Sequence, residues 1–332
     1  MIMRFVYLCV TLLLFAVSCA SPEQEKRTQE MRAWMAPGGK IKALCTLAMV
    51  RDLVQEVGGD QVDCVLLIDG ELDPHSYELV KGDAEKFVRA DMIFYVGLGL
   101  EHGASLAKQL QDNLKAYALG DSLRQTALEG EILHVNGQTD PHVWMDMNLW
   151  AATVPAIVRA LSEKDPDHAV DYRARGVGVQ ARLLSTHSKI LEEMARIPSE
   201  KRYLVTSHDA FHYFARAYLA TDEERENESW RQRCAAPEGL APESELSLRD
   251  IQKIVDHVLQ YRVTVLFPES NLSKDSIRKI VDAVGHRGLV VTLAPELLYG
   301  DAMGPPGSDG DTYEKMIFHN ARIMQNYWRS AR

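Results

Sequence analysis

Cysteine is scarce in this chain and lacks a metal-binding spacing. Five of the 332 residues are cysteines, and Cys9 and Cys19 fall in an apolar N-terminal leader. No C-x-x-C pair occurs, which argues against a thiolate metal site. Cys45 and Cys64 lie in neighbouring predicted strands, so an oxidising compartment could pair them, but the sequence leaves their geometry open.

Positive charge is also in deficit. Lysine and arginine number 37 against 47 aspartates and glutamates, which gives a net charge of −10. The clustered Lys and Arg that phosphates require are missing, so no nucleic-acid partner is expected. An acidic chain is compatible with a cation as ligand.

Long apolar runs are missing beyond the N-terminus. There, Arg4 supplies a positive charge, residues 5–17 are apolar, and small residues follow at 18–20. This is the layout of a secretory signal peptide over residues 1–18. An apolar run of about 13 residues is too short for the ~20 that span a bilayer. We therefore expect export to the periplasmic or cell-surface side.

The end of the leader resembles a bacterial lipobox, with Ala16 where leucine is usual. Cleavage there would make a lipidated Cys19 the mature N-terminus and anchor the protein to a membrane. The polar residues that follow, within 19–39, are then expected to form a flexible tether.

The remaining residues suffice for two domains of about 150 residues each. Short apolar runs alternate with amphipathic stretches, a pattern typical of β-α units with parallel sheets. We predict an α/β fold of two lobes. Its strands are expected at 41–49, 62–68, 92–96 and 116–119 in the first lobe, and at 203–206, 263–267 and 289–293 in the second.

Between the two series, residues 147–161 and 166–197 are charged and helix-periodic. We predict one long helix connecting the lobes rather than a linker rich in Gly, Ser and Pro. The predicted boundaries are 40–145 for the N-terminal lobe, 146–200 for the helical connection and 201–332 for the C-terminal lobe. Residues 221–246 break the rhythm and are expected to form a surface insertion.

A near-duplicated motif carries most of the chemistry: Asp73-Pro74-His75 and Asp140-Pro141-His142. Proline fixes φ and removes a donor, so each histidine should be held on a stiff loop at a strand end. In open α/β sheets this rim is where ligands bind.

His208 and Asp301 each follow a predicted strand of the second lobe. With His75 and His142 they could converge between the lobes, and three imidazoles with one carboxylate suit a divalent transition metal. Four protein ligands leave no obvious position for an activated water, which favours binding over catalysis.

The sequence is similar to the TroA/ZnuA-like, or cluster A-I, metal-binding receptors of ABC importers. The resemblance spans the mature chain and rests on strings in family order: Asp73-Pro74-His75, Asp140-Pro141-His142-Val143-Trp144, Ser207-His208-Asp209-Ala210-Phe211, Glu269-Ser270-Asn271, Asp301-Ala302-Met303 and His319-Asn320. Finer agreement, as in Gly97-Leu98-Gly99-Leu100-Glu101-His102, resembles the chlamydial YtgA-type branch, whose proposed cargo includes iron.

The resemblance implies a lipid-anchored monomer with His75, His142, His208 and Asp301 as metal ligands, delivering its ion to a membrane permease with a cytoplasmic ATPase. The cargo class is left open. Zinc-specific members carry a His-rich loop, but residues 130–139 contain one histidine, and manganese-specific members place Glu at the position of His208. Zn, Mn and Fe(II) all remain as cargo.

Glu269, Asp209 and His319 are candidates to orient the ligands through hydrogen bonds. Two rival functions are weighed against the receptor. His208 and His212, four apart on a predicted helix, could belong to a secreted zinc hydrolase, although Asp209 replaces the Glu of the peptidase motif. The chain could also be an adhesin whose metal only stabilises the fold.

Overall fold

The structure, a computed structural model, describes residues 22–242 and 247–330. The predicted signal peptide at 1–18 and Cys19 lie outside the described residues. The chain divides into two compact units, 1–39 and 40–332. In the first, residues expected to form a flexible tether contain helix α2 (Pro22–Met35). Its Glu, Gln, Lys, Arg and Met are strong helix formers, which explains the difference.

The second unit begins with a four-stranded parallel sheet in the order β2-β1-β3-β4. Its strands are β1 (Ile41–Cys45), β2 (Val62–Leu66), β3 (Met92–Tyr95) and β4 (Ala116–Ala118). The connections are α3 (Ala48–Gly58) with η1 (Gly59–Gln61), α4 (Asp83–Arg89) and α5 (Ala104–Leu110). All four predicted strands are confirmed, with β1 shorter than expected because α3 already begins at Ala48.

After β4, short elements complete the N-terminal lobe and lead to the helix that connects the two lobes. These are η2 (Gly120–Gln125), η3 (Glu129–Glu131), the hairpin β5 (His134–Val135) and β6 (Gln138–Thr139), η4 (Val143–Met145), α6 (Met147–Ala151), α7 (Val154–Lys164) and η5 (Pro166–His168). The hairpin turns at Asn136 and Gly137, both with positive φ, as a two-residue hairpin turn requires. We call the part from β1 to η4 the N-terminal lobe.

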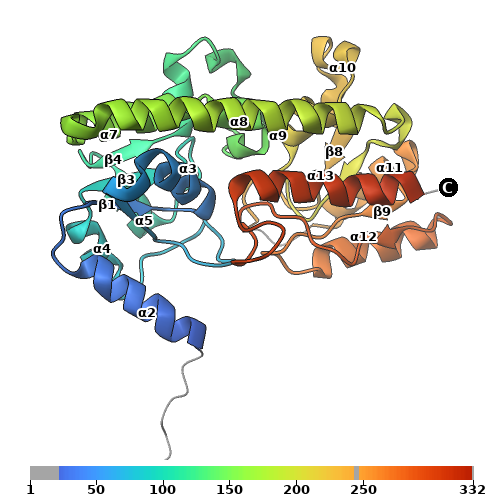
Figure 1. Cartoon of the computed structure of the whole chain (residues 1–332). Coiled ribbons are helices and arrows are strands. Elements are labelled where there is room, and N and C mark those ends of the chain that lie inside the picture. The colour runs from blue at the N-terminus through green and yellow to red at the C-terminus, as the bar shows by residue number, and fades with distance from the viewer. Residues whose placement is uncertain (1–21, 243–246, 331–332) are drawn as a thin grey trace, which may run out of the picture. The chain divides into compact units, whose positions relative to one another are not determined.

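The predicted connecting helix is confirmed as α8 (Ala169–Ala195), 27 residues long. It packs against α3 of the N-terminal lobe and α13 (Tyr313–Ser330) of the second lobe. Figure 1 shows it running past the strands of both lobes. Gly176 and Gly178 do not interrupt it. A Cβ on Gly176 would lie 2.4 Å from Val158 of α7, so this glycine lets the two helices approach closely.

The C-terminal lobe, from β7 to α13, is also built on parallel pairs. β7 (Leu204–Val205) pairs with β8 (Cys234–Ala235), and β9 (Val265–Leu266) pairs with β10 (Thr292–Leu293). A backbone hydrogen bond from Phe267 to Val205 joins β9 to β7. The turn η6 (Ser199–Lys201) precedes the lobe. Its other elements are α9 (His212–Phe214), the π-helical turn η7 (Ala215–Leu219), α10 (Asp222–Glu226), η8 (Ser229–Arg233), α11 (Leu248–Tyr261) and α12 (Asp275–His286).

The expectation of a surface insertion at 221–246 is wrong around Trp230 and β8, although residues 222–228 are mostly exposed. Trp230 is 2% exposed, and Cys234 and Ala235 form β8. The strand β8 was not predicted from the sequence, because a strand of two residues is too short to show the period-2 alternation of apolar residues.

Among residues 22–242 and 247–330, none of the helices combines the length and the apolarity that crossing a bilayer demands. Cys45, Cys64 and Cys234 are all free thiols.

Candidate metal centre

The two Asp-Pro-His motifs fold in the same way. In the first, the Asp73 side chain accepts the backbone N–H of His75 at 2.9 Å. In the second, Asp140 accepts the N–H of His142 at 3.0 Å. Such Asx turns are local, two residues long and stiffened by the proline between. Each motif therefore fixes its histidine in the loop after a strand, as the sequence predicts.

The second lobe presents its side chains from loops as well. His208 follows β7, and its backbone N–H donates to Glu269 at 2.9 Å. A backbone bridge pairs Glu269 with Leu298, just ahead of Asp301. The predicted helix over His208 is wrong, because α9 begins only at His212. His208 and His212 therefore do not share a helical face.

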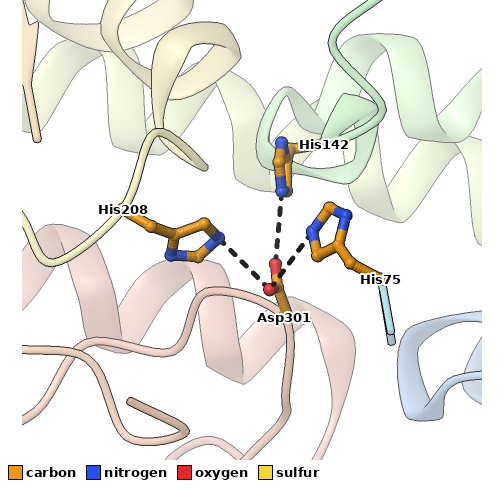
Figure 2. Close-up of side chains that lie close together, drawn as sticks. All are labelled: His75, His142, His208 and Asp301. Atoms are coloured by element: carbon orange, nitrogen blue, oxygen red, sulfur yellow. Dashed lines mark ion pairs between the residues drawn. The ribbon is translucent and has the colours of Figure 1, made fainter. Parts of the chain in front are cut away.

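The four candidate ligands converge on one point (Figure 2). His75, His142, His208 and Asp301 each offer an atom within 4.8 Å of the other three. The Nε2 atoms lie 3.6, 3.4 and 3.2 Å, respectively, from the Asp301 carboxylate. All four residues are at most 1% exposed.

The converging atoms contact one another as ion pairs but make no hydrogen bond within the described part of the chain. The three Nε2 atoms and both Asp301 oxygens are buried without a hydrogen-bond partner. Buried polar atoms are normally paired, and leaving one unpaired costs about 1–3 kcal/mol. Five such atoms around one point are the arrangement that a metal ion satisfies.

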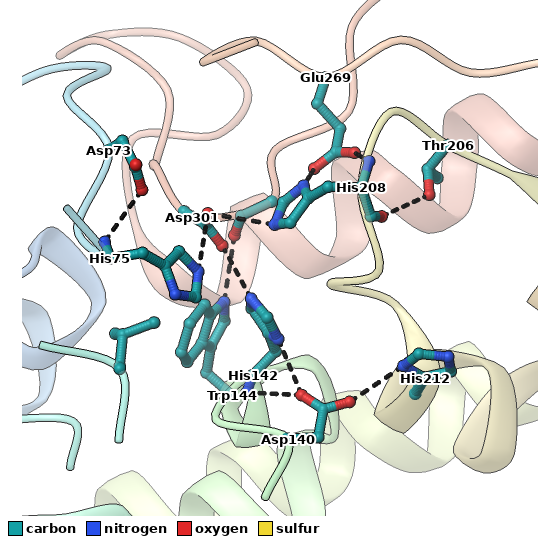
Figure 3. A network of polar contacts seen from close by, with 12 residues as sticks. Asp73, His75, Asp140, His142, Trp144, Thr206, His208, His212, Glu269 and Asp301 are labelled. Carbon is teal, nitrogen blue, oxygen red and sulfur yellow. Dashed lines mark hydrogen bonds and ion pairs between the residues drawn. The ribbon is translucent and has the colours of Figure 1, made fainter. Parts of the chain in front are cut away.

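Two of the imidazoles are oriented from behind by carboxylates (Figure 3). His142 Nδ1 lies 2.8 Å from Asp140, and His208 Nδ1 lies 2.8 Å from Glu269. Asp140 accepts a hydrogen bond from His142 Nδ1, which leaves the lone pair on Nε2, the atom that faces the cluster. Glu269 forms an ion pair with His208 Nδ1 and favours the same tautomer there.

A further histidine, His212, reinforces this arrangement, and sequence reasoning placed it only in the rival zinc hydrolase. His212 Nδ1 lies 3.0 Å from the second oxygen of Asp140, and Tyr213 donates its hydroxyl to the Asp140 backbone carbonyl at 3.0 Å. Helix α9 of the C-terminal lobe therefore holds a loop of the N-terminal lobe. The aspartate that precedes each Pro-His pair was the sequence signal from which these contacts behind the clustered histidines could have been predicted.

The histidines and carboxylates of the cluster shift one another's pKa values. Burial by itself would lower the pKa of His208, but the carboxylates of Glu269 and Asp301 outweigh it and hold that pKa well above the usual value. Burial likewise opposes ionisation of Asp301, yet the neighbouring histidines hold its pKa well below the usual range. For His142, burial dominates and lowers the pKa. The Asp301 carboxylate therefore stays ionised in the buried cluster.

The other sequence candidates lie farther out. Asp209 is nearest to His212, at 3.9 Å from its Nε2. His319 hydrogen-bonds the backbone carbonyl of Leu297 at 3.1 Å, so it holds the chain ahead of Asp301 rather than a ligand side chain. Of the three residues expected to orient ligands, Glu269 is the one in contact with a clustered imidazole.

Aromatic side chains close the site. Trp144 is fully buried, and its indole Nε1–H donates to the carbonyl of Gly300, beside Asp301, at 3.1 Å. Tyr313 in turn donates its hydroxyl to the Trp144 carbonyl at 2.6 Å. Tyr77 and Phe211, each two or three residues beyond a clustered histidine, are buried as well. Water is thus kept from the cluster by packing.

Comparison with known proteins gives one family. The model of the family described as ZnuA, zinc-uptake complex component A, periplasmic, matches residues 44–327. The metal-binding protein YtgA of Chlamydia muridarum is 37% identical over 317 residues, covering 96% of this chain and 92% of the relative. The manganese-binding lipoprotein MntA of Bacillus subtilis is 31% identical over 287 residues, covering 86% and 89%.

The fold is also found in solved structures. The crystal structure of Fe(III)-bound YtgA from Chlamydia trachomatis superposes with a TM-score of 0.82 at 37% identity, covering 87% of this chain and 98% of that one.

Proposed function

The chain belongs to the ZnuA family of periplasmic metal-uptake components, and on that premise we propose that it captures one divalent transition-metal ion at the four clustered side chains. The receptor then delivers the ion to a membrane ABC permease driven by a cytoplasmic ATPase. Relatives are named as metal-binding proteins, and one, PsaA of Streptococcus pneumoniae, as a manganese ABC transporter substrate-binding lipoprotein.

One observation carries the assignment of ligands. His75, His142, His208 and Asp301 place five buried, unpartnered polar atoms around one point. A purely structural cluster would satisfy these atoms with hydrogen bonds to one another or to the backbone, whereas here the imidazoles only approach the carboxylate as ion pairs at 3.2–3.6 Å. A divalent ion would instead accept all three lone pairs and the carboxylate at once.

Charge supports a divalent cargo. Three neutral imidazoles and one carboxylate around a divalent ion carry a net charge of +1, and the outer carboxylates of Asp140 and Glu269 lie directly behind two of the ligands. These carboxylates raise the basicity of the imidazoles and offset the remaining positive charge. Acidification protonates the ligands and releases the ion.

The donor set narrows the choice of ion. Imidazole suits zinc and iron, whereas manganese prefers oxygen donors. With three nitrogens and one carboxylate, we propose Zn or Fe(II) ahead of Mn as cargo. The family description names zinc, one relative is named for manganese and one solved relative holds Fe(III), so competition among the three ions is the deciding measurement.

The cellular setting follows from the leader and the family. We propose export through the signal peptide at 1–18, a lipid anchor on Cys19, and action as a monomer. We also propose lobe boundaries at 40–145 and 201–332, with 146–200 as the connection, because each lobe then carries two of the four ligands.

The ligand assignment is tested by metal content. Purified without affinity-tag metals and loaded with Zn²⁺, the wild-type protein should hold one ion, and the double variant His142→Ala, Asp301→Ala should hold none after desalting. The double variant Asp282→Ala, His286→Ala on the exposed face of α12 is the matched control. A stoichiometric ion in the first double variant would refute the assignment.

A further inference from the structure

The Asp301 carboxylate lacks the outer contact that orients two of the clustered imidazoles. Asp140 and Glu269 stand behind His142 and His208. Both oxygens of Asp301 face the imidazoles as ion pairs, and neither accepts a hydrogen bond from the described residues. Those ion pairs involve only the other proposed ligands. The position of this carboxylate must therefore be set by the backbone that carries it.

A buried asparagine holds that backbone two residues upstream. Asn320 of α13 accepts the N–H of Tyr299 at 2.9 Å through Oδ1, and its Nδ2 donates to the Tyr299 carbonyl at 2.8 Å. The backbone N–H only donates and the carbonyl only accepts, so the orientation of the amide is fixed. One side chain thus pairs with both backbone groups of one residue, and rotation of the amide would break both bonds at once.

The neighbours of Tyr299 are held from other directions. Leu298 exchanges two backbone hydrogen bonds, both at 2.9 Å, with the chain at 268–270 that follows β9. The carbonyl of Gly300 accepts the indole N–H of Trp144, which belongs to the N-terminal lobe. The asparagine belongs to the lobe that carries the carboxylate, so its contact persists when the two lobes tilt relative to each other.

Tyr299 also closes the loop beyond the carboxylate. A Cβ on Gly310 would lie 2.3 Å from its ring, and one on Gly304 would lie 2.8 Å from its hydroxyl oxygen. Gly304 donates its N–H to the carbonyl of Gly310 at 2.8 Å. Residues 304–310 therefore fold onto this ring. Asp301 lies between the fixed backbone of Tyr299 and the closed loop, so a shift of Tyr299 would move the carboxylate.

Asn320 is a polar residue on an apolar helical face. The buried face of α13 includes Tyr313, Met316, Ile317 and Met324, and Asn320 falls among them with an exposed fraction of 0%. An apolar side chain would match this periodicity, because a buried amide is unfavourable unless it is hydrogen-bonded. A residue that breaks the local pattern in this way is expected at functional sites. The two bonds to the loop of the carboxylate account for it.

We propose that Asn320 is a positioning residue for metal binding, which fixes the backbone of Tyr299 and thereby holds the Asp301 carboxylate at the ion. It acts through the backbone and is not itself a ligand. Asp301 is the one oxygen donor among the four proposed ligands. Mn²⁺, which prefers oxygen, therefore depends on this positioning more than Zn²⁺, which imidazole suits. The inference rests on the proposed function.

A double-mutant cycle on the full mature protein separates positioning from general stability. Asn320→Leu removes both bonds to Tyr299 at similar volume. Asn320→Asp keeps an acceptor for the N–H but, as a carboxylate, has no donor for the carbonyl. Each is also combined with Asp301→Ala, and Asn326→Leu on the exposed side of α13 is the matched control. Kd for Zn²⁺ and for Mn²⁺ is measured by chelator competition, and urea denaturation of the metal-free variants checks that they fold.

Asn320→Leu should raise Kd by about tenfold for Zn²⁺ and by about 100-fold for Mn²⁺, while Asn326→Leu behaves as wild type. Asn320→Asp should fall between wild type and Asn320→Leu. In the Asp301→Ala background neither change at Asn320 should weaken Zn²⁺ binding further, because the carboxylate that Asn320 positions is gone.

A loss that persists in the Asp301→Ala background would overturn the proposal, since Asn320 would then act on the fold as a whole. Equal losses for the two ions, or unchanged Kd values in both Asn320 variants, would overturn it as well. If Asn320→Leu does not fold, Asn320→Asp decides by the same criteria. Wild-type protein that binds no ion would refute the proposed function itself.

Discussion

Two of the three clustered imidazoles, those of His142 and His208, are oriented by a short contact between Nδ1 and a carboxylate. Glu269 contributes most, because one oxygen accepts the backbone N–H groups of Ser207 and His208, both at 2.9 Å, while the other contacts His208 Nδ1 at 2.8 Å. A single side chain thus sets the backbone, the tautomer and the ring direction of one proposed ligand.

Glu269→Gln should therefore weaken metal binding. The amide can still accept from the backbone, but it offers an N–H where His208 Nδ1 needs an acceptor, which favours the wrong tautomer. We expect Kd for Zn²⁺ to rise by about 10–100-fold, measured by chelator competition.

The exposed Glu296→Gln provides the control for that measurement and should leave Kd unaltered. If Glu269→Gln bound Zn²⁺ as tightly as wild type, the contact from Glu269 to His208 would have no part in holding the ion.

Among the elements, α8 matters most, because both lobes pack on it. Two of its glycines stand in opposite environments. A Cβ on Gly176 would lie 2.4 Å from Val158 of α7, whereas one on Gly178 would meet nothing within 4 Å. The helix therefore contains one glycine that packing requires and one that it does not.

This contrast predicts opposite effects on stability. Gly178→Ala should raise the free energy of unfolding by up to about 1 kcal/mol, through helix propensity. Gly176→Ala gains the same propensity but pushes on Val158, whose branched side chain is stiff in a helix, and should lower the free energy of unfolding by about 1–3 kcal/mol. Urea denaturation of the two variants checks this, and a stabilised Gly176→Ala would contradict the close approach of α7 and α8.

At the scale of the whole molecule, the lobes are joined by direct contacts as well as by α8. Asp52 of α3 accepts the backbone N–H of Tyr313, the first residue of α13, at 2.8 Å. Arg182 of α8 lies between them, paired with Glu56 of α3 and, at 2.9 Å, with Glu314 of α13. Together with the bond from Trp144 to Gly300, these contacts favour small tilts over a wide hinge motion.

Asp52 should give this junction a pH dependence. Burial raises its pKa from 3.8 to about 6, so between these values the folded state binds more protons than the unfolded state. The contribution of Asp52 to the free energy of unfolding therefore falls as pH rises through this window. Asp52→Asn removes that loss and keeps an oxygen for the Tyr313 N–H.

Urea denaturation at pH 4.5 and pH 7.5 measures the effect. Relative to wild type, Asp52→Asn should gain on the order of 2 kcal/mol between the two pH values, whereas the exposed Asp60→Asn should gain little. If the free energy of unfolding changed equally with pH in Asp52→Asn and in wild type, Asp52 would not be desolvated in the folded protein.

The sequence by itself determined the α/β fold, the connecting helix and the four residues that cluster. Apolar runs, helical periodicity and the Asp-Pro-His turns are local, so their consequences can be read within a few residues. It missed β8, placed a helix over His208 and did not foresee the contact of His212 with Asp140, since a two-residue strand and a contact 72 residues apart leave no local pattern. Only the tertiary structure decided that five buried atoms without a hydrogen bond face one point and that His212 supports His142 through Asp140. Those facts depend on which loops the folded sheets bring together.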